Sequence, residues 1–132
     1  MEPDDLTPDE AAVLAANQAF YDAFEARSLD GMDDVWVHSD EVVCTHPGWK
    51  PLVGWDAVRA SWASLLQNEE HLQFIVTELE VVLRTDMAMV RASENLLAGG
   101  QMRGSVATIN VFVLDDGRWR MLAHHGSPVM RA

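Results

Sequence analysis

Basic residues, cysteines and long apolar runs are scarce in this sequence of 132 residues, and each scarcity excludes a class of protein. Nine Lys and Arg stand against 21 Asp and Glu, which gives a net charge of −12. Such a surface repels phosphate backbones and anionic lipid headgroups, so neither nucleic acid nor a membrane is an expected partner. Cys44 is the single cysteine, which excludes an intramolecular disulfide, and its apolar neighbours predict a buried structural thiol. No apolar run approaches the length of about 18 residues that a transmembrane helix needs.

Motifs that bind common cofactors are also missing. We find no glycine-rich dinucleotide motif, phosphate-binding loop or nucleophile elbow, so nucleotide cofactors and serine hydrolase chemistry are not expected. His46, Glu94 and His125 form one conceivable set of metal ligands, but HExxH and HxH spacings are absent and we predict no metal site. The acidic N-terminus, residues 1–5, lacks a basic-then-apolar leader pattern, which predicts a cytoplasmic location.

The length and composition are those of one ordinary globular domain. Apolar residues make up 48% of the chain and charged residues 23%, as is usual for such domains. A chain of 132 residues is also close to the commonest domain size. We therefore predict a single domain over residues 1–132, with residues 1–6 flexible. Five Trp against four Phe and one Tyr indicate large rings that line a core or a cavity.

The periodicity of apolar residues predicts helices first and strands afterwards. Thr7 and Glu10 form a capping-box pattern around Pro8, which marks the start of the first helix. Helical spacing and turn residues then set the element boundaries. The expected helices cover 8–26, 28–36 and 55–67, and the expected strands cover 42–45, 72–83, 86–97, 104–114 and 118–125. This order predicts an α+β fold with a largely antiparallel sheet.

Two polar residues share strand faces with apolar ones. Glu94 alternates in register with the apolar residues of strand 86–97, and His125 does so in strand 118–125. A buried carboxylate or imidazole needs a partner or a purpose. Both residues are therefore candidates for a functional site.

The predicted strand 104–114 is apolar on both faces, apart from Thr108 and Asn110. Two apolar faces predict a sheet that is covered on both sides. The helices can cover one face, and a second copy of the chain is the expected cover of the other. The sequence therefore predicts a homodimer.

Several stretches resemble a known family along nearly the whole chain. They are VCTHPGW (43–49), LVG (52–54), VRASW (58–62), NVF (110–112), GRW (117–119) and HHGSP (124–128). These stretches, in this order of helices and strands, resemble the SnoaL-like branch of the nuclear transport factor 2-like superfamily, which includes ketosteroid isomerase. The resemblance implies a cystatin-like cone, in which two to three N-terminal helices pack on a curved mixed or antiparallel sheet. It also implies a ligand pocket inside the cone and dimers packed through the sheet.

The resemblance carries one site position to this chain. The isomerase has its catalytic Asp immediately before a Pro, after the first strand, and that position resembles His46-Pro47 here. An imidazole therefore replaces a carboxylate. The isomerase's helical Tyr falls near Phe20 or Tyr21, and its oxyanion-binding acid has no counterpart. Steroid isomerisation by that mechanism is not expected.

Three histidines are candidates for acid–base chemistry. His46 is predicted to be a general base, or alternatively a packed turn residue. His124 and His125 are adjacent in a strand and should point to opposite faces. Parity favours His125 in the pocket, as acid or donor, unless a bulge intervenes. In that case His124 is the ligand contact.

The remaining candidates are a carboxylate, an amide and three indoles. Glu94 either orients a histidine, acts as a second acid–base group, or pairs with an arginine. Asn110 either donates to a substrate carbonyl or satisfies a neighbour in the sheet. Trp36, Trp49 and Trp62 either wall a flat apolar ligand or belong to the core.

These observations favour a pocket domain that binds a small, largely apolar organic molecule. His-based acid–base chemistry would suit isomerisation, cyclisation or dehydration without a cofactor. The alternative is a non-catalytic dimeric domain used for binding or assembly, because one fold serves many functions.

Overall fold

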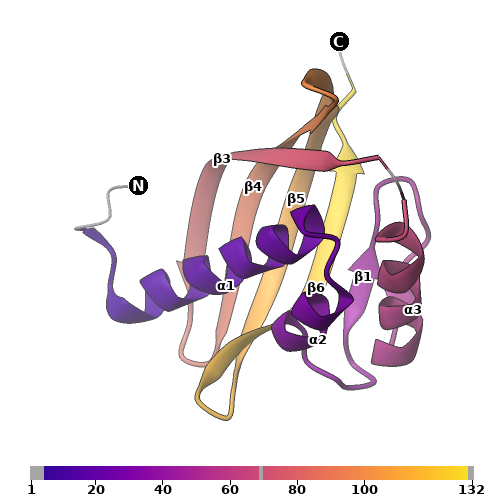
Figure 1. The fold of residues 1–132 in the computed structure, drawn as a ribbon. Coiled ribbons are helices and arrows are strands. Elements are labelled where there is room, and N and C mark those ends of the chain that lie inside the picture. Colours follow the sequence, from indigo (N-terminus) through magenta and orange to yellow (C-terminus); the bar gives the residue numbers. More distant parts are fainter. Residues whose placement is uncertain (1–4, 69, 131–132) are drawn as a thin grey trace.

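The computed structural model describes residues 5–68 and 70–130, and Figure 1 shows its helices lying against one side of a long sheet. The flexibility predicted for residues 1–6 falls mostly on residues 1–4, which lie outside the described residues. The elements in chain order are α1 (Pro8–Glu25), α2 (Leu29–Val35), β1 (Val43–Thr45), β2 (Leu52–Val53), α3 (Trp55–Leu65), β3 (Leu72–Leu83), β4 (Met87–Ala98), β5 (Gln101–Asp115) and β6 (Arg118–Pro128).

Helix α1 begins where the capping box predicts. The Glu10 backbone N–H donates to the Thr7 hydroxyl at 3.1 Å, and the Thr7 N–H donates to the Glu10 carboxylate at 2.9 Å. These bonds satisfy two of the donors that a helix start leaves free. The helix then buries Val13 and Phe20 completely against the sheet. The apolar stripe predicted from the sequence is therefore the face that contacts the core.

The six strands form one mixed sheet in the order β2-β1-β6-β5-β4-β3. All neighbouring strands are antiparallel except β1 and β6, which run parallel. The α+β prediction is confirmed, and the predicted strand boundaries differ from the observed ones by a few residues. The two-residue strand β2 was not predicted, because so short a strand leaves no periodicity to detect. At the β5–β6 turn Asp116 and Gly117 both have positive φ, 49° and 81°, as the predicted Asp-Gly hairpin requires.

Strand β6 contains an irregularity that changes which side chains face inward. Ala123 pairs with Val111 of β5, while Met121 pairs with the next residue, Phe112, so Leu122 has no partner in the ladder. One extra residue in a strand reverses the inward–outward alternation beyond it. His124 is therefore buried and His125 is exposed. The parity argument that placed His125 in the interior was wrong for this reason.

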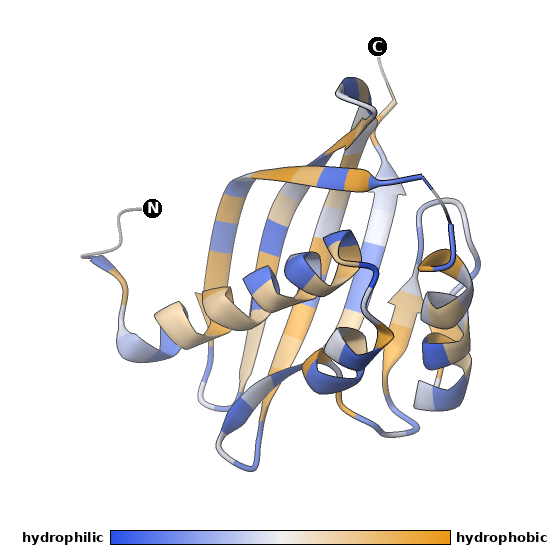
Figure 2. Cartoon of the chain, viewed as in Figure 1, coloured by the Kyte–Doolittle hydropathy of each residue, from blue (hydrophilic) through white to orange (hydrophobic). Residues whose placement is uncertain are grey.

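The two faces of the sheet differ in their cover. Apolar and polar residues alternate along the long strands (Figure 2), and the helices cover one face, which we call the inner face. The outer face has no cover within the described chain and leaves Ile75 and Ile109 about half exposed, at 50% and 43%. No helix of the described residues is long and apolar enough to span a membrane.

Candidate functional site

A cavity of about 180 Å³ lies between the helices and the inner face of the sheet. Its lining combines aromatic rings, aliphatic side chains and three titratable groups. The lining residues are Phe24, His46, Pro47, Trp49, Leu65, Phe74, Glu94, Leu96, Val106 and His124. They come from α1, α3, the segment after β1 and four strands, so the complete fold is needed to assemble the cavity.

The segment after β1 is held tightly against β6. Gly126 of β6 leaves room for the Pro47 ring, since a Cβ there would lie 3.2 Å from the Pro47 Cγ. The turn closes when the Trp49 N–H donates to the His46 carbonyl at 2.8 Å. This packing fixes the His46 ring at the cavity wall.

Hydrogen bonds determine which nitrogen of His46 carries the proton. The Ser61 hydroxyl donates its only hydrogen to the Val58 carbonyl, with 2.6 Å between the oxygens. His46 Nε2 lies 2.8 Å from the Ser61 oxygen, so Nε2 must be the donor in that contact. Burial lowers the pKa of His46 from 6.5 to about 4, which keeps the ring neutral at pH 7. The neutral ring therefore has its lone pair on Nδ1.

The carboxyl group of Glu94 lies deep in the structure with one close partner. Tyr21 donates its phenolic hydrogen to Glu94 Oε2 at 2.6 Å, and Glu94 is only 3% exposed. Burial raises the pKa of Glu94 to about 7, although the Tyr21 hydrogen bond opposes that shift. Burial, followed by the nearby Glu94 charge, raises the pKa of Tyr21. Glu94 is thus ready to gain or lose a proton near neutral pH.

His124 stands at the end of a buried chain of amides. Asn110 donates from Nδ2 to the Asn17 side-chain oxygen at 2.8 Å, and its own Oδ1 lies 2.6 Å from His124 Nδ1. Nδ1 of His124 therefore donates, and the lone pair is on Nε2. Burial, reinforced by His46 and His125, lowers the pKa of His124 to about 3. The residue is neutral and held in one tautomer.

Aromatic side chains form the walls around these polar groups. Phe24 and Phe74 have ring centroids 4.5 Å apart, and Trp49 packs edge-on to His46 at 4.9 Å. Trp49 is 45% exposed, so this wall lies next to solvent. Trp62 is fully buried behind His46, with ring centroids 4.7 Å apart.

The structure brings together four of the residues predicted from the sequence. His46, Trp49, Glu94 and His124 all line the cavity. His125 is on the outer face, where Ser127 lies within hydrogen-bond distance.

Three further predicted residues lie outside the cavity lining. Trp36 and Trp62 belong to the core, and Asn110 lies behind His124 as its hydrogen-bond partner. Core packing and satisfaction of a sheet neighbour were the alternatives recognised from the sequence.

Asn17 and Ser61, which support the cavity groups, were not predicted from the sequence, and Tyr21 was named only as one of two counterparts of the isomerase's helical Tyr. Asn17 and Tyr21 lie one helical turn apart on the stripe that also carries Val13 and Phe24. A polar pair on an apolar helix stripe is the same signal that identified Glu94 on its strand. Ser61 carries no such signal, because a serine in a helix is ordinary.

Two other arrangements in the molecule do not form comparable sites. Cys44 is buried, lies 3.7 Å from His46 Nε2, and has its pKa raised by burial to about 12, so the thiol stays protonated. Among residues 5–68 and 70–130 no group of three His, Cys, Asp or Glu side chains could hold a metal ion.

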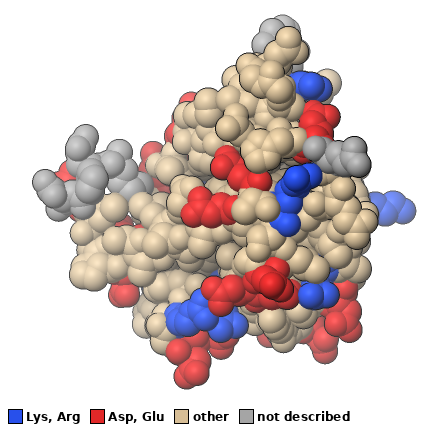
Figure 3. Space-filling view, in the orientation of Figure 1, with Lys and Arg blue, Asp and Glu red and all other residues tan. Residues whose placement is uncertain are grey.

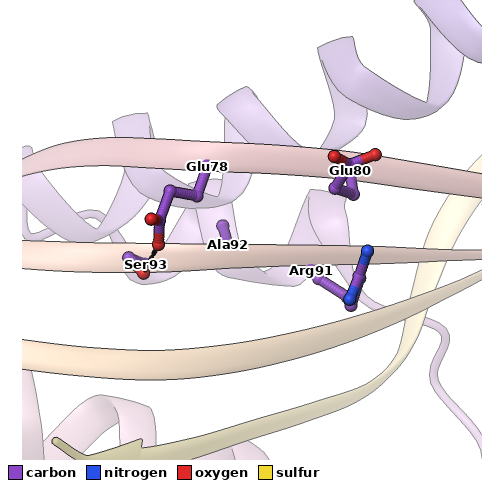
Figure 4. Close-up of a pocket in the computed structure, with 5 residues that line it drawn as sticks. All are labelled: Glu78, Glu80, Arg91, Ala92 and Ser93. Atoms are coloured by element: carbon purple, nitrogen blue, oxygen red, sulfur yellow. Dashed lines mark hydrogen bonds between the residues drawn. The ribbon is translucent and has the colours of Figure 1, made fainter.

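A hollow on the outer face is larger than the inner cavity, and Figure 4 shows the side chains that line it. Its volume is about 460 Å³, and Glu78, Glu80, Arg91, Ala92 and Ser93 line it. Glu78 accepts a hydrogen bond from Ser93 at 2.7 Å, but its carboxylates are exposed to water. The inner cavity is more enclosed and brings together buried titratable groups, so it is the stronger candidate site.

Helices packed on a mixed sheet around an internal cavity define the cystatin-like class of α+β fold. A structure from Nostoc punctiforme described by that fold has a TM-score of 0.79, with 94% of both chains covered. At 10% identity this similarity concerns the fold alone. The family model of the SnoaL-like domain matches residues 13–131, and the chain therefore belongs to the SnoaL-like family.

More similar relatives have diverse descriptions. An NTF2-like family protein from Streptomyces avermitilis, provisionally described as a dehydratase, is 34% identical with a TM-score of 0.85 and 95% and 100% coverage. A Thiobacillus denitrificans protein, provisionally described as a calcium/calmodulin-dependent protein kinase type II association domain, is 36% identical with a TM-score of 0.83 and 94% and 96% coverage. The F-box protein SKIP8 of Arabidopsis thaliana is 31% identical over 119 residues, which is 90% of this chain and 50% of that protein. The chain thus spans half the length of this curated relative.

Proposed function

We propose that this SnoaL-like domain binds a small, largely apolar organic molecule in its inner cavity and acts on it by acid–base chemistry. The observation that carries this proposal is the convergence of Glu94, His46 and His124 on one aromatic-walled cavity. Titratable groups with shifted pKa values in a cleft are typical of functional sites. Isomerisation, cyclisation and dehydration can each proceed by proton transfer without a cofactor.

The pKa values favour Glu94 over His46 as the group that exchanges protons. A general acid or base works best when its pKa is near the working pH, and Glu94 meets that condition with a pKa of about 7. His46, with a pKa of about 4, is a weaker base and serves better as an acceptor that orients the substrate. Proton transfer by Glu94 would contribute roughly 10²–10⁴-fold to a rate.

A thermal-shift screen with small aromatic acids, alcohols and amines, sized for a cavity of about 180 Å³, tests the binding proposal. A ligand that binds only the folded chain raises its melting temperature by mass action. With a ligand and a reaction found, Glu94→Gln should abolish most turnover and leave folding intact. His46→Ala should weaken substrate binding more than turnover. No response across a broad screen would count against a binding cavity.

A specific observation favours a second function, that of a dimeric assembly domain. The outer face carries exposed apolar side chains beside an apolar hollow that Val82, Met87, Met89 and Val111 help to line. Exposed apolar surface of this kind marks interfaces. One relative described as an association domain supports the same reading.

Light scattering tests the dimer directly. A biological sheet-to-sheet interface should bury more than roughly 1,000 Å² in total. We expect a mass twice the 14.7 kDa of one chain at micromolar concentration. A monomer mass at that concentration would refute the dimer and leave the cavity proposal unaffected.

A further inference from the structure

Protein donors and acceptors are unequally available in the inner cavity. The Nε2 hydrogen of His46 is used by Ser61, and the Nδ1 hydrogen of His124 is used by Asn110. The lone pairs of these rings are therefore on Nδ1 of His46, where the Cys44 sulfur lies 3.9 Å away, and on Nε2 of His124. Of the two nitrogens, Nε2 of His124 is the acceptor to which no side chain of the described residues donates. When Glu94 is ionised, the lining side chains among the described residues provide acceptors, apart from the indole of Trp49.

Among the described residues that line the cavity, Glu94 is the one that carries a formal charge when it is ionised. Its Oε2 accepts from Tyr21, and no donor from the described residues reaches Oε1. Among residues 5–68 and 70–130, no Lys or Arg lines the cavity. A buried carboxylate with a free oxygen is stabilised by a cation or a strong donor.

The aromatic walls of the cavity and the negative net charge of the molecule both favour a positively charged ligand. Phe24, Trp49 and Phe74 offer ring faces or edges around the cavity, and aromatic faces attract cations. Acidic side chains are spread over the face shown in Figure 3, and the net charge of −12 attracts cations from solution. A volume of about 180 Å³ limits the ligand to a small molecule.

We propose that the cavity selects a small organic amine, bound as its ammonium ion, over neutral or anionic molecules of the same size. The ammonium group pairs with Glu94 and donates to Nε2 of His124, while its apolar body packs against the aromatic walls. This inference rests on the proposed binding function and adds the chemical class of the ligand.

Three probes of one shape and different charge test the inference: benzylamine, benzyl alcohol and benzoate. Each is titrated into the chain at about pH 8, where Glu94 is ionised, and binding is followed by nuclear magnetic resonance of the tryptophan indoles. Concentrations up to about 10 mM reach the weak affinities of ligands this small. We expect benzylamine to bind about tenfold tighter than benzyl alcohol, and benzoate to bind weakest.

Glu94→Gln and Glu80→Gln form a matched pair of variants. Both remove one negative charge, but Glu80 lies on the outer face. Glu94→Gln should lower benzylamine affinity to the level of benzyl alcohol. Glu80→Gln should leave benzylamine affinity unchanged. Equal losses in both variants would mean that net charge alone attracts the amine, which would overturn the inference.

The affinities of the three probes are compared on the natural chain, so this test does not depend on whether a variant folds. Equal or tighter binding of benzyl alcohol or benzoate would overturn the amine inference and uphold the cavity as a binding site. Failure of all three probes to bind would overturn both the inference and the proposed binding of molecules of this size.

Discussion

Asn and Glu residues occur on both faces of the sheet, but their surroundings differ between the inner and the outer face. On the inner face, Asn110 and Glu94 are buried and each is tied to a residue of α1. On the outer face, Asn95 bonds only to its strand neighbours, and Glu80 is exposed. Residue identity therefore does not determine the chemistry here. The helix layer does, because it removes water from one face and fixes proton positions there.

The largest expected effect comes from removing a buried ring on the covered side. Trp62→Ala leaves a cavity beneath His46 and should lower the free energy of unfolding by about 3–5 kcal/mol. Ile109→Ala on the outer face should cost less than about 1 kcal/mol, because Ile109 is already 43% exposed. Urea unfolding measures both. A large, concentration-dependent loss for Ile109→Ala would mean that a second copy covers the outer face.

The second largest expected effect is a pH-dependent change in stability that comes from buried Glu94 on the inner face. The raised pKa of Glu94 means that the folded state binds its proton more tightly than the unfolded state, where the pKa is about 4.5. Its stabilising contribution is present below pH 4.5 and is lost as pH rises through about 7. Glu94→Gln should therefore become more stable relative to the natural chain by about 2–3 kcal/mol between those pH values.

His46 and His124 change the stability in the opposite direction to Glu94 over an overlapping range of pH. The lowered pKa values of His46 and His124 give stability that is present above pH 6.5 and lost as pH falls through about 4 and about 3. Urea unfolding from about pH 4 to 9 should thus show a maximum near neutral pH. A flat difference between Glu94→Gln and the natural chain would contradict the raised pKa.

A smaller loss is expected from breaking the buried amide chain. Asn110→Ala leaves the His124 Nδ1 hydrogen and the Asn17 oxygen without their partner and should cost about 2 kcal/mol. Asn95→Ala is the matched outer-face change and should cost less than about 1 kcal/mol, because water replaces its bonds. Thermal melting compares the two variants. Equal losses would show that the helix layer confers no special role on Asn110.

The smallest effect is expected at the exposed histidine of the adjacent pair. His125→Gln should change stability by no more than about 0.5 kcal/mol and leave the affinity for a cavity ligand unchanged. His124→Gln, one residue earlier, should lower both. If His125→Gln weakened ligand binding instead, the bulge at Leu122 would be misplaced.

Local signals made most of the fold predictable. The Thr7–Glu10 capping box, helical stripes and the Asp116-Gly117 turn each act over a few residues, and each appears where the sequence indicates. The cone-shaped arrangement of helices and sheet was predicted from the family resemblance. Glu94 was found because a charged group on an apolar strand face conflicts with its surroundings.

The remaining details depend on contacts between distant segments. The Leu122 bulge has no signature in an apolar run, yet it exchanges the roles of His124 and His125. The bond between Asn17 and Asn110 joins residues 93 positions apart, and no local rule pairs them. Tautomers and pKa values follow only from such contacts, so the sequence could name candidates but not their protonation.

The uneven burial of the indoles gives the molecule its own optical reporter. Trp36, Trp62 and Trp119 are shielded from water and should emit at short wavelengths, whereas Trp49 is 45% exposed and should emit at the long-wavelength edge. Because Trp49 is also part of the cavity wall, an occupant that displaces water from it should shift that edge toward the blue. Cavity occupancy can therefore be followed by intrinsic fluorescence without any label, and Trp49→Phe would silence the signal.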